Sequence, residues 1–290
     1  MSTTTRLTLT ADALRELPSR LTERDRFIIR VLAEHRVLTT PQVADLGFTH
    51  PQFAERRLRQ LYFLRVVDRV RPLCWPGSAP YHWLLDDGGA AVVAADRGVT
   101  VAELGWNRER VLASIMSSQR LAHLVGTNGF FTALIRTARL SSERCSLDEW
   151  WSERRCTQEL GTGMAQPDAF GVWQVGASRL AFFLEYDCGT ERPASRLAAK
   201  LPGYVRLARS TASSGTPPWW LLFSFPGERR EASVRRALRS VGVPIATCAR
   251  GGADPAAAIW RPLDGDGPQA RVALSDVAGL AQQANASVAA

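Results

Sequence analysis

The feature that most constrains the fold is a pair of apolar runs at residues 170–175 and 180–184, separated by a short turn that contains Gly176. Both runs are rich in β-branched and aromatic residues, and this pattern predicts the two strands of a β-hairpin. The second run is apolar at consecutive positions, which is typical of a strand buried on both faces. We therefore expect the hairpin to lie inside a sheet that is covered by other elements.

Acidic residues mark both ends of this hairpin. Asp168 precedes the first strand, while Glu185 and Asp187 end the second. A hairpin brings those ends together, and side chains two positions apart on a strand face the same way. Carboxylates that converge repel one another, and a divalent cation held by oxygen ligands relieves the repulsion. The sequence thus predicts that Asp168, Glu185 and Asp187 share one site that holds Mg²⁺ or Mn²⁺.

Helical and strand patterns alternate through the rest of the C-terminal half. Strands are predicted near residues 219–223, 244–248 and 258–260, and helices over residues 193–209 and 228–241. Strands that alternate with helices indicate a mixed α/β sheet with helices on its faces. Residues 107–140, before the hairpin, carry apolar residues at helical spacing, and residues 266–290 form an Ala-, Gln- and Ser-rich tail.

The N-terminal part predicts three short helices and then a second hairpin. Residues 1–20 are expected to be a flexible lead, and Thr22 is the expected cap of the first helix. Strands at residues 66–71 and 81–85 flank a turn at residues 76–80. Three helices with a tight turn before the third indicate a helix-turn-helix, and the added hairpin makes it a winged helix over residues 21–98.

The outward side of the third predicted helix is rich in arginine and glutamine. Such side chains reach base edges and phosphates in the major groove, and a wing carries further arginines to the backbone. Phe53 is expected to point inward. The predicted DNA-binding residues are Gln52, Arg56, Arg57, Arg59, Gln60, Arg69 and Arg71. The alternative is a solvated arginine face on a winged helix that binds protein.

Charge and cysteine content narrow the class of protein further. The net charge is +8, from 36 Lys and Arg against 28 Asp and Glu, which favours an anionic partner such as nucleic acid. Only Lys200 is a lysine, so much of the arginine excess is compositional. Five scattered cysteines form no C-x-x-C pair, which argues against a zinc site. The chain carries neither a signal-peptide core nor an apolar run of membrane length, so we expect a cytoplasmic protein without membrane contact.

Taken in order, these features resemble the replication-relaxation family, a winged helix followed by a PD-(D/E)XK nuclease-like domain. The matching stretches are residues 21–36, 121–123, Asn128, Glu153, 167–169, 183–187, Thr190, Glu191, 200–201 and Tyr204. The resemblance covers residues 20–265 and implies a restriction-endonuclease-like α/β domain over residues 107–265. It also implies a role on DNA in plasmid replication or relaxation.

The sequence departs from the nuclease pattern at one position. Asp187 stands where the nuclease-like family has a lysine that orients or deprotonates the attacking water. Lys200, on the following helix, is the candidate replacement, and Glu153 is a candidate additional ligand. The candidate catalytic residues are therefore Asp168, Glu185, Asp187, Lys200 and Glu153. A domain that no longer cuts, with its acids paired to Arg192 and Arg196, is the alternative.

The sequence favours a DNA-binding protein of plasmid or mobile-element replication and DNA relaxation, with cutting by its nuclease-like domain left open. A metal-dependent DNA endonuclease or nickase is the second hypothesis. A winged-helix transcriptional regulator with an assembly domain is the third. The expected partners are double-stranded DNA, other replication or conjugation proteins, and a second copy of the chain in a homodimer.

Overall fold

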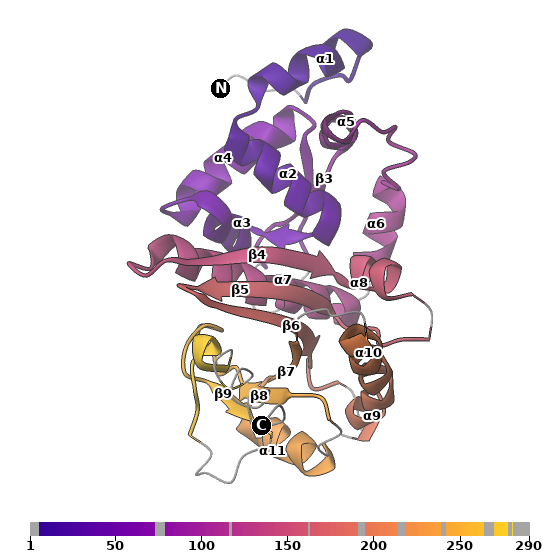
Figure 1. The fold of residues 1–290 in the computed structure, drawn as a ribbon. Coiled ribbons are helices and arrows are strands. Elements are labelled where there is room, and N and C mark those ends of the chain that lie inside the picture. The colour runs from indigo at the N-terminus through magenta and orange to yellow at the C-terminus, as the bar shows by residue number, and fades with distance from the viewer. Residues whose placement is uncertain are drawn as a thin grey trace. The chain divides into compact units, whose positions relative to one another are not determined.

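The computed structural model describes residues 6–72, 79–115, 118–161, 163–190, 195–213, 218–238, 242–263, 270–277 and 280. The chain divides into two compact units, Met1–Thr132 and Ala133–Ala290. Helices and strands of both units are drawn in Figure 1. Helices together with a six-stranded sheet of mixed direction confirm the predicted mixed α/β class.

The first unit is mainly helical and contains one small antiparallel sheet, with strand order β1-β3-β2. Its helices are α1 (Ala11–Glu16), η1 (Leu17–Arg20), α2 (Glu23–His35), α3 (Thr40–Gly47), α4 (Pro51–Phe63), α5 (Asp87–Arg97), α6 (Arg108–Ile115) and the first part of α7 (Ser118–Leu140). Its strands are β1 (Leu38–Thr39), β2 (Val67–Val70) and β3 (His82–Leu85).

The order α2, α3, α4, β2, β3 is the one that the sequence predicts. Thr22 caps α2 through a reciprocal pair of hydrogen bonds with Asp25, whose carboxylate accepts from the Thr22 N–H at 2.8 Å. The two-residue strand β1 was not predicted, because so short a strand has no alternation to detect. Residues 76–78 of the predicted wing turn lie outside the described residues.

Residues 11–20 were expected to be part of a flexible lead, and the structure corrects this. They form α1 and η1, with the Thr10 hydroxyl accepting from the Ala13 N–H at 3.2 Å at the start of α1. Leu17 anchors the segment because its side chain is completely buried. Ala13, Leu14 and Leu17 stand at helical spacing, but this stripe covers only one turn and ends at Pro18, so the sequence pattern did not reveal the packing.

The division between the units falls within α7, whereas the sequence placed the start of the second domain at residue 107. The amide of Asn128 on α7 donates to the carbonyls of His35 at 3.2 Å and Val37 at 2.7 Å. The Gln42 amide donates to the carbonyl of Val125 at 2.6 Å. These bonds satisfy buried backbone acceptors and hold the first part of α7 within the first unit.

The second unit is built around a six-stranded sheet with strand order β4-β5-β6-β7-β8-β9. The pairs β4–β5, β5–β6 and β8–β9 are antiparallel, and the pairs β6–β7 and β7–β8 are parallel. The strands are β4 (Cys145–Ser152), β5 (Ala169–Val175), β6 (Ser178–Tyr186), β7 (Trp219–Phe225), β8 (Ile245–Ala249) and β9 (Trp260–Pro262). The helices are α8 (Glu153–Leu160), α9 (Ser195–Ala198), α10 (Leu201–Ser213) and α11 (Glu228–Ala237).

The predicted hairpin forms β5 and β6, and β6 is buried along most of its length. Phe182 and Leu184 on one side of the strand are fully buried, and Phe183 on the other side is 4 % exposed. The Phe183 side joins a cluster with residues of α10 and α11, so these helices cover that face of the sheet. A buried parallel pair such as β6–β7 requires such cover, because both faces are apolar.

Part of the predicted tail packs against the sheet. Val272 and Trp260 exchange backbone hydrogen bonds of 3.0 and 2.8 Å, and the side chains of Leu274 and Val277 are fully buried. Leu274 and Val277 therefore join the second unit's core.

Two features of the described residues concern membrane spans and disulfide bonds. None of the described helices combines the length and the apolarity that a bilayer-spanning helix needs. Cys145, Cys156, Cys188 and Cys248 are free, and Cys74 lies outside the described residues.

The burial of β6 predicts how much stability is lost when a buried side chain of this strand is replaced by a charged one. Leu184→Asp should lower the free energy of unfolding by about 3 kcal/mol or more, because it buries an unpaired carboxylate. Chemical denaturation measures the change. Arg179→Ala, at an exposed position on the same strand, is the control and should stay within about 0.5 kcal/mol of the parent. A Leu184→Asp variant as stable as that control would contradict the central place of β6.

Candidate functional site

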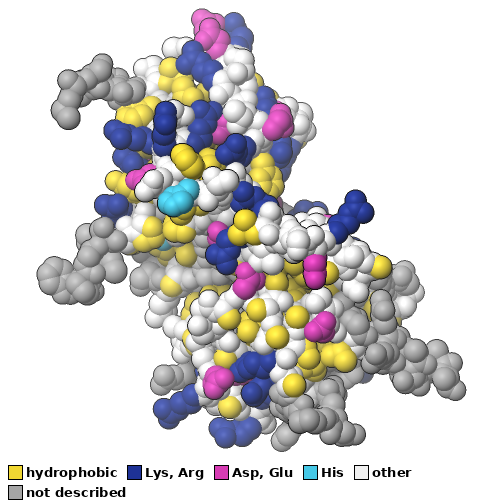
Figure 2. All heavy atoms as spheres, turned by 90° about the vertical axis from the view of Figure 1, so that its left-hand side faces the viewer, with side chains coloured by type: hydrophobic (Ala, Val, Ile, Leu, Met, Phe, Trp, Pro, Cys, Tyr) yellow, Lys and Arg dark blue, Asp and Glu magenta, His cyan; other side chains and the backbone are white. Residues whose placement is uncertain are grey.

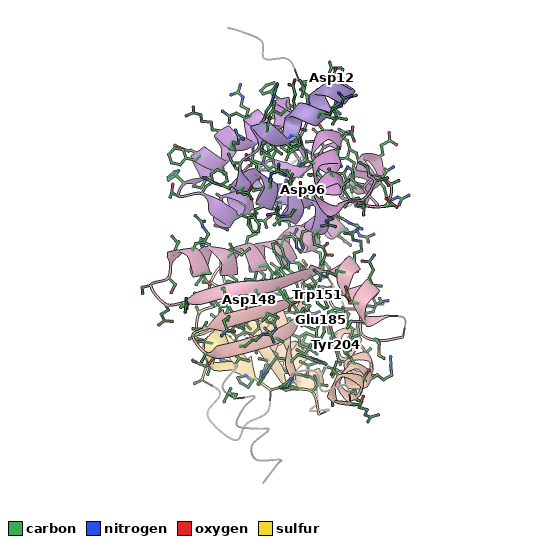
Figure 3. All side chains as sticks on the ribbon, turned by 45° about the horizontal axis from the view of Figure 1, so that its top comes forward. Asp12, Asp96, Asp148, Trp151, Glu185 and Tyr204 are labelled. Atoms are coloured by element: carbon green, nitrogen blue, oxygen red, sulfur yellow. The ribbon has the colours of Figure 1, made fainter. Side chains whose placement is uncertain are left out.

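A buried glutamate at the end of β6 forms the centre of the first candidate site. Glu185 is 1 % exposed, and each of its carboxylate oxygens accepts one hydrogen bond. Lys200 Nζ donates to Oε2 at 2.5 Å, and the Tyr204 hydroxyl donates to Oε1 at 2.5 Å. Lys200 directly precedes α10 and Tyr204 lies in its first turn, so the packing of α10 on the sheet places both donors. Figure 3 labels Glu185 and Tyr204 in this unit.

The surroundings of Glu185 shift its protonation into the neutral range. The pKa of Glu185 is raised to about 7, mainly by burial and then by the neighbouring Asp168 carboxylate, while Lys200 and Tyr204 act in the opposite direction. Burial also raises the pKa of Tyr204 well above its ordinary value, and the Glu185 charge adds to that effect. Tyr204 therefore remains a hydrogen-bond donor while Glu185 exchanges its proton near pH 7.

Asp168 is positioned beside the same end of β6. Its N–H donates to the carbonyl of Leu184 at 3.1 Å, and its carboxylate accepts from the N–H of Tyr186 at 2.7 Å. The two bonded residues, Leu184 and Tyr186, are the ones directly before and after Glu185 on β6. The structure thus brings together Asp168, Glu185 and Lys200, three of the predicted site residues.

Asp187 does not join them, although the sequence placed it in the same site. Its carboxylate accepts from Arg230 Nε at 2.6 Å and from the Gly189 N–H at 2.7 Å, and its carbonyl accepts from Arg250 at 2.7 Å. The expectation required an extended strand through residue 187, but β6 ends at Tyr186. Beyond that point the chain turns through Gly189, which has a φ of 78°.

Glu153 is the exposed first residue of α8 and directly follows Ser152, which pairs with Ala169 beside Asp168. Within the described ranges, no group of three or more His, Cys, Asp and Glu side chains is arranged to hold a metal ion. Asp168 and Glu185 remain as a pair of carboxylates. Such a pair fits Mg²⁺, which commonly takes one or two carboxylates and completes its shell with water. Arg192, a predicted partner of the acids, lies outside the described residues.

The second candidate site is the solvent-exposed side of α4. Four of the predicted DNA-binding residues are exposed there: Gln52, Arg56, Arg59 and Gln60. Arg57 was also predicted to face outward, and this is corrected by the structure. Its guanidinium donates to both oxygens of the buried Asp25, at 2.9 and 2.6 Å, and thereby links α4 to α2. Figure 2 shows many Arg side chains on this face of the first unit.

Phe53 was predicted to point inward and instead is 57 % exposed. Ala54, Leu58 and Leu61 occupy the inward positions of α4. These three positions already form a complete helical stripe, spaced four and three residues apart, so Phe53 falls beside the stripe rather than within it. The helix therefore presents one aromatic ring among its exposed polar side chains.

Arginine and aromatic side chains alternate at the end of the β2–β3 hairpin nearest its turn. The Arg69 guanidinium lies 4.7 Å from the ring centre of Tyr62 and 4.2 Å from that of Tyr81. Arg71 lies over the same Tyr81 ring at 4.1 Å, and Arg6 lies over Tyr62 at 4.1 Å. Arg69 is thus enclosed between two rings. Arg71 is exposed at the end of this stack.

Comparison with known proteins identifies the family. The replication-relaxation family model matches residues 29–217. The match extends from α2 through α10, so it includes both the α4 surface and the site at Glu185. The chain belongs to the replication-relaxation family, and this supports a role in the replication or relaxation of plasmids or mobile elements. No curated protein and no solved structure matches the chain.

The raised pKa of Glu185 predicts how stability depends on pH. The folded protein holds this proton up to about pH 7, whereas the unfolded chain releases it near 4.5, so stability falls as the pH rises between those values. Glu185→Gln removes that ionisation and keeps an oxygen for Tyr204. We expect the variant to match the parent near pH 4.5 and to exceed it above pH 7, by at most about 3 kcal/mol.

Denaturation at several pH values measures this difference. The control is Glu153→Gln, which removes an exposed carboxylate from the same unit and should show no such window. A Glu185→Gln variant whose advantage does not grow with pH would show that Glu185 ionises as an ordinary carboxylate.

Proposed function

We propose that this protein binds double-stranded DNA through helix α4, as its part in plasmid or mobile-element replication and relaxation. The observation that carries the proposal is the exposed row of Gln52, Arg56, Arg59 and Gln60 on the outer side of that helix. Guanidinium and amide groups are the side chains that most often hydrogen-bond to phosphates and to purine edges in the major groove.

The arrangement around α4 supports this proposal. Helices α2, α3 and α4 followed by the β2–β3 hairpin have the element order of a winged helix, in which the third helix enters the major groove. Arg57 bonded to Asp25 holds α4 against α2, so the reading helix is fixed before DNA arrives. Arg71 is the wing residue we assign to a phosphate contact, and Arg69 acts by stiffening the end of the hairpin nearest its turn.

Removing two exposed arginines tests the DNA-binding surface. Arg56→Ala combined with Arg59→Ala should weaken binding to duplex DNA. It should also reduce the slope of log affinity against log salt by about 0.9 for each phosphate that the variant no longer neutralises. Fluorescence anisotropy at several salt concentrations measures both quantities. Arg30→Ala with Arg97→Ala removes the same charge from exposed positions on α2 and α5 and serves as the control.

If the α4 variant and the control lose affinity equally, net charge explains the binding and the assignment of α4 fails. Unchanged affinity and slope in the α4 variant would reject it as well.

A second candidate function is metal-dependent cleavage of DNA in the second unit, and the contact of Lys200 with Glu185 favours it. In a nuclease site of the proposed kind, Asp168 and Glu185 would hold Mg²⁺ or Mn²⁺, and the ion would supply an activated water and charge neutralisation. Lys200, 2.5 Å from Glu185, would place a positive charge beside the phosphate under attack. Asp187, bonded to Arg230, would act by fixing the loop after β6.

Metal binding tests this second function. Millimolar Mn²⁺ should raise the melting temperature of the parent, since an ion at 100 times its dissociation constant stabilises the folded state by about 2.7 kcal/mol. Asp168→Asn keeps an acceptor for the Tyr186 N–H but removes the charge, and should abolish the shift. Asp148→Ala, at an exposed position on β4, should retain it.

Nicking of supercoiled plasmid then separates binding from cutting. Cleavage that requires Mn²⁺ and is lost in Lys200→Ala, with the melting shift retained, supports an endonuclease. A shift without cleavage supports a domain that holds metal but does not cut. A parent with no melting shift at any Mn²⁺ concentration rules out the metal-dependent function.

A further inference from the structure

Phe53 is an exposed aromatic ring near the N-terminal end of the proposed DNA-binding surface. Isolated exposed apolar residues are common on protein surfaces, so exposure alone carries no function. The position is informative here, because Phe53 is the third residue of α4. The first residues of a recognition helix are those that come nearest to base edges.

The neighbours of Phe53 define the direction of its ring. His50, the residue before α4, makes no side-chain cap on the helix. Its imidazole instead meets the Phe53 ring edge-on, with the ring centres 6.5 Å apart and the planes at 77°. Phe53 also shares one face of α4 with Arg56 and Gln60, which follow it by three and seven residues. This face therefore combines one apolar contact with two groups that form hydrogen bonds.

The major groove contains one apolar group that such a ring matches. Each base edge presents hydrogen-bond donors and acceptors, and thymine alone adds a C5-methyl group, which apolar side chains such as phenylalanine contact. We propose that Phe53 packs against the C5-methyl group of a thymine and makes the protein prefer thymine at that position of its site. This inference rests on the proposed DNA binding by α4 and adds a specificity-determining residue to it.

The test uses the tightest-binding duplex selected by the parent protein from a randomised synthetic pool. Each thymine of that duplex is replaced in turn by deoxyuridine, which removes the methyl group and leaves every phosphate and hydrogen-bonding group in place. At one position or more, the parent should bind the deoxyuridine duplex about fourfold more weakly, as expected for one buried methyl group. Phe53→Ala should bind both duplexes equally, with the affinity that the parent shows for the deoxyuridine form.

Two further variants act as controls. Phe53→Leu keeps an apolar side chain and should retain part of the discrimination. Val101→Ala shortens another exposed apolar residue of the first unit and should retain all of it. Any effect of deoxyuridine on duplex shape is common to parent and variants, so it cancels in the comparison.

The outcomes separate this inference from the proposed function. A parent that binds no duplex overturns both. A parent that binds duplex DNA without any thymine-methyl preference, or a Phe53→Ala variant that keeps the preference, overturns only the assignment of Phe53. A Phe53→Ala variant that keeps the preference but dissociates a dimer of the parent overturns the assignment too, and makes Phe53 a contact between two copies of the chain.

Discussion

Strand β6 pairs with a neighbour on each side, antiparallel to β5 and parallel to β7, and its side chains are buried on both faces. Helix α10 packs on the sheet, because the apolar face that includes Phe183 must be removed from water. The burial also extends to the last residues of the strand, where Glu185 lies. A carboxylate in that position loses its hydration, and Lys200 and Tyr204 supply the bonds that water would have made. The chemistry of the site is thus a result of how the sheet is covered.

The sequence was sufficient to predict the strands whose apolar residues form local patterns. The two apolar runs predicted the β5–β6 hairpin, and its geometry brought Asp168 and Glu185 to one end, as expected. Asp187 shows where local patterns stop being informative. Its partner Arg230 is 43 residues further along the chain, and no spacing in the sequence predicts such a pair. Arg250, which bonds to the Asp187 carbonyl and covers the Tyr186 ring, was missed for the same reason.

Helix α4 shows the same division between local and long-range information. Its helical period predicted the exposure of Gln52, Arg56, Arg59 and Gln60. The period did not decide Arg57, because an ion pair with Asp25 on another helix turns that side chain toward the protein. Phe53 was misplaced because residue type was given more weight than position on the helix.

The pairing of Lys200 with Glu185 has a practical chemical consequence, because Lys200 is the only lysine among 290 residues. Within these residues it is therefore the one side-chain amine that an acylating reagent can modify. Its ammonium group is held by a carboxylate that changes charge near neutral pH, and its side chain is about one-third exposed. The rate of acylation at this single amine would thus report directly on the local state of the site. A label attached to Lys200, without any mutation, would report the binding or release of a ligand at the end of β6.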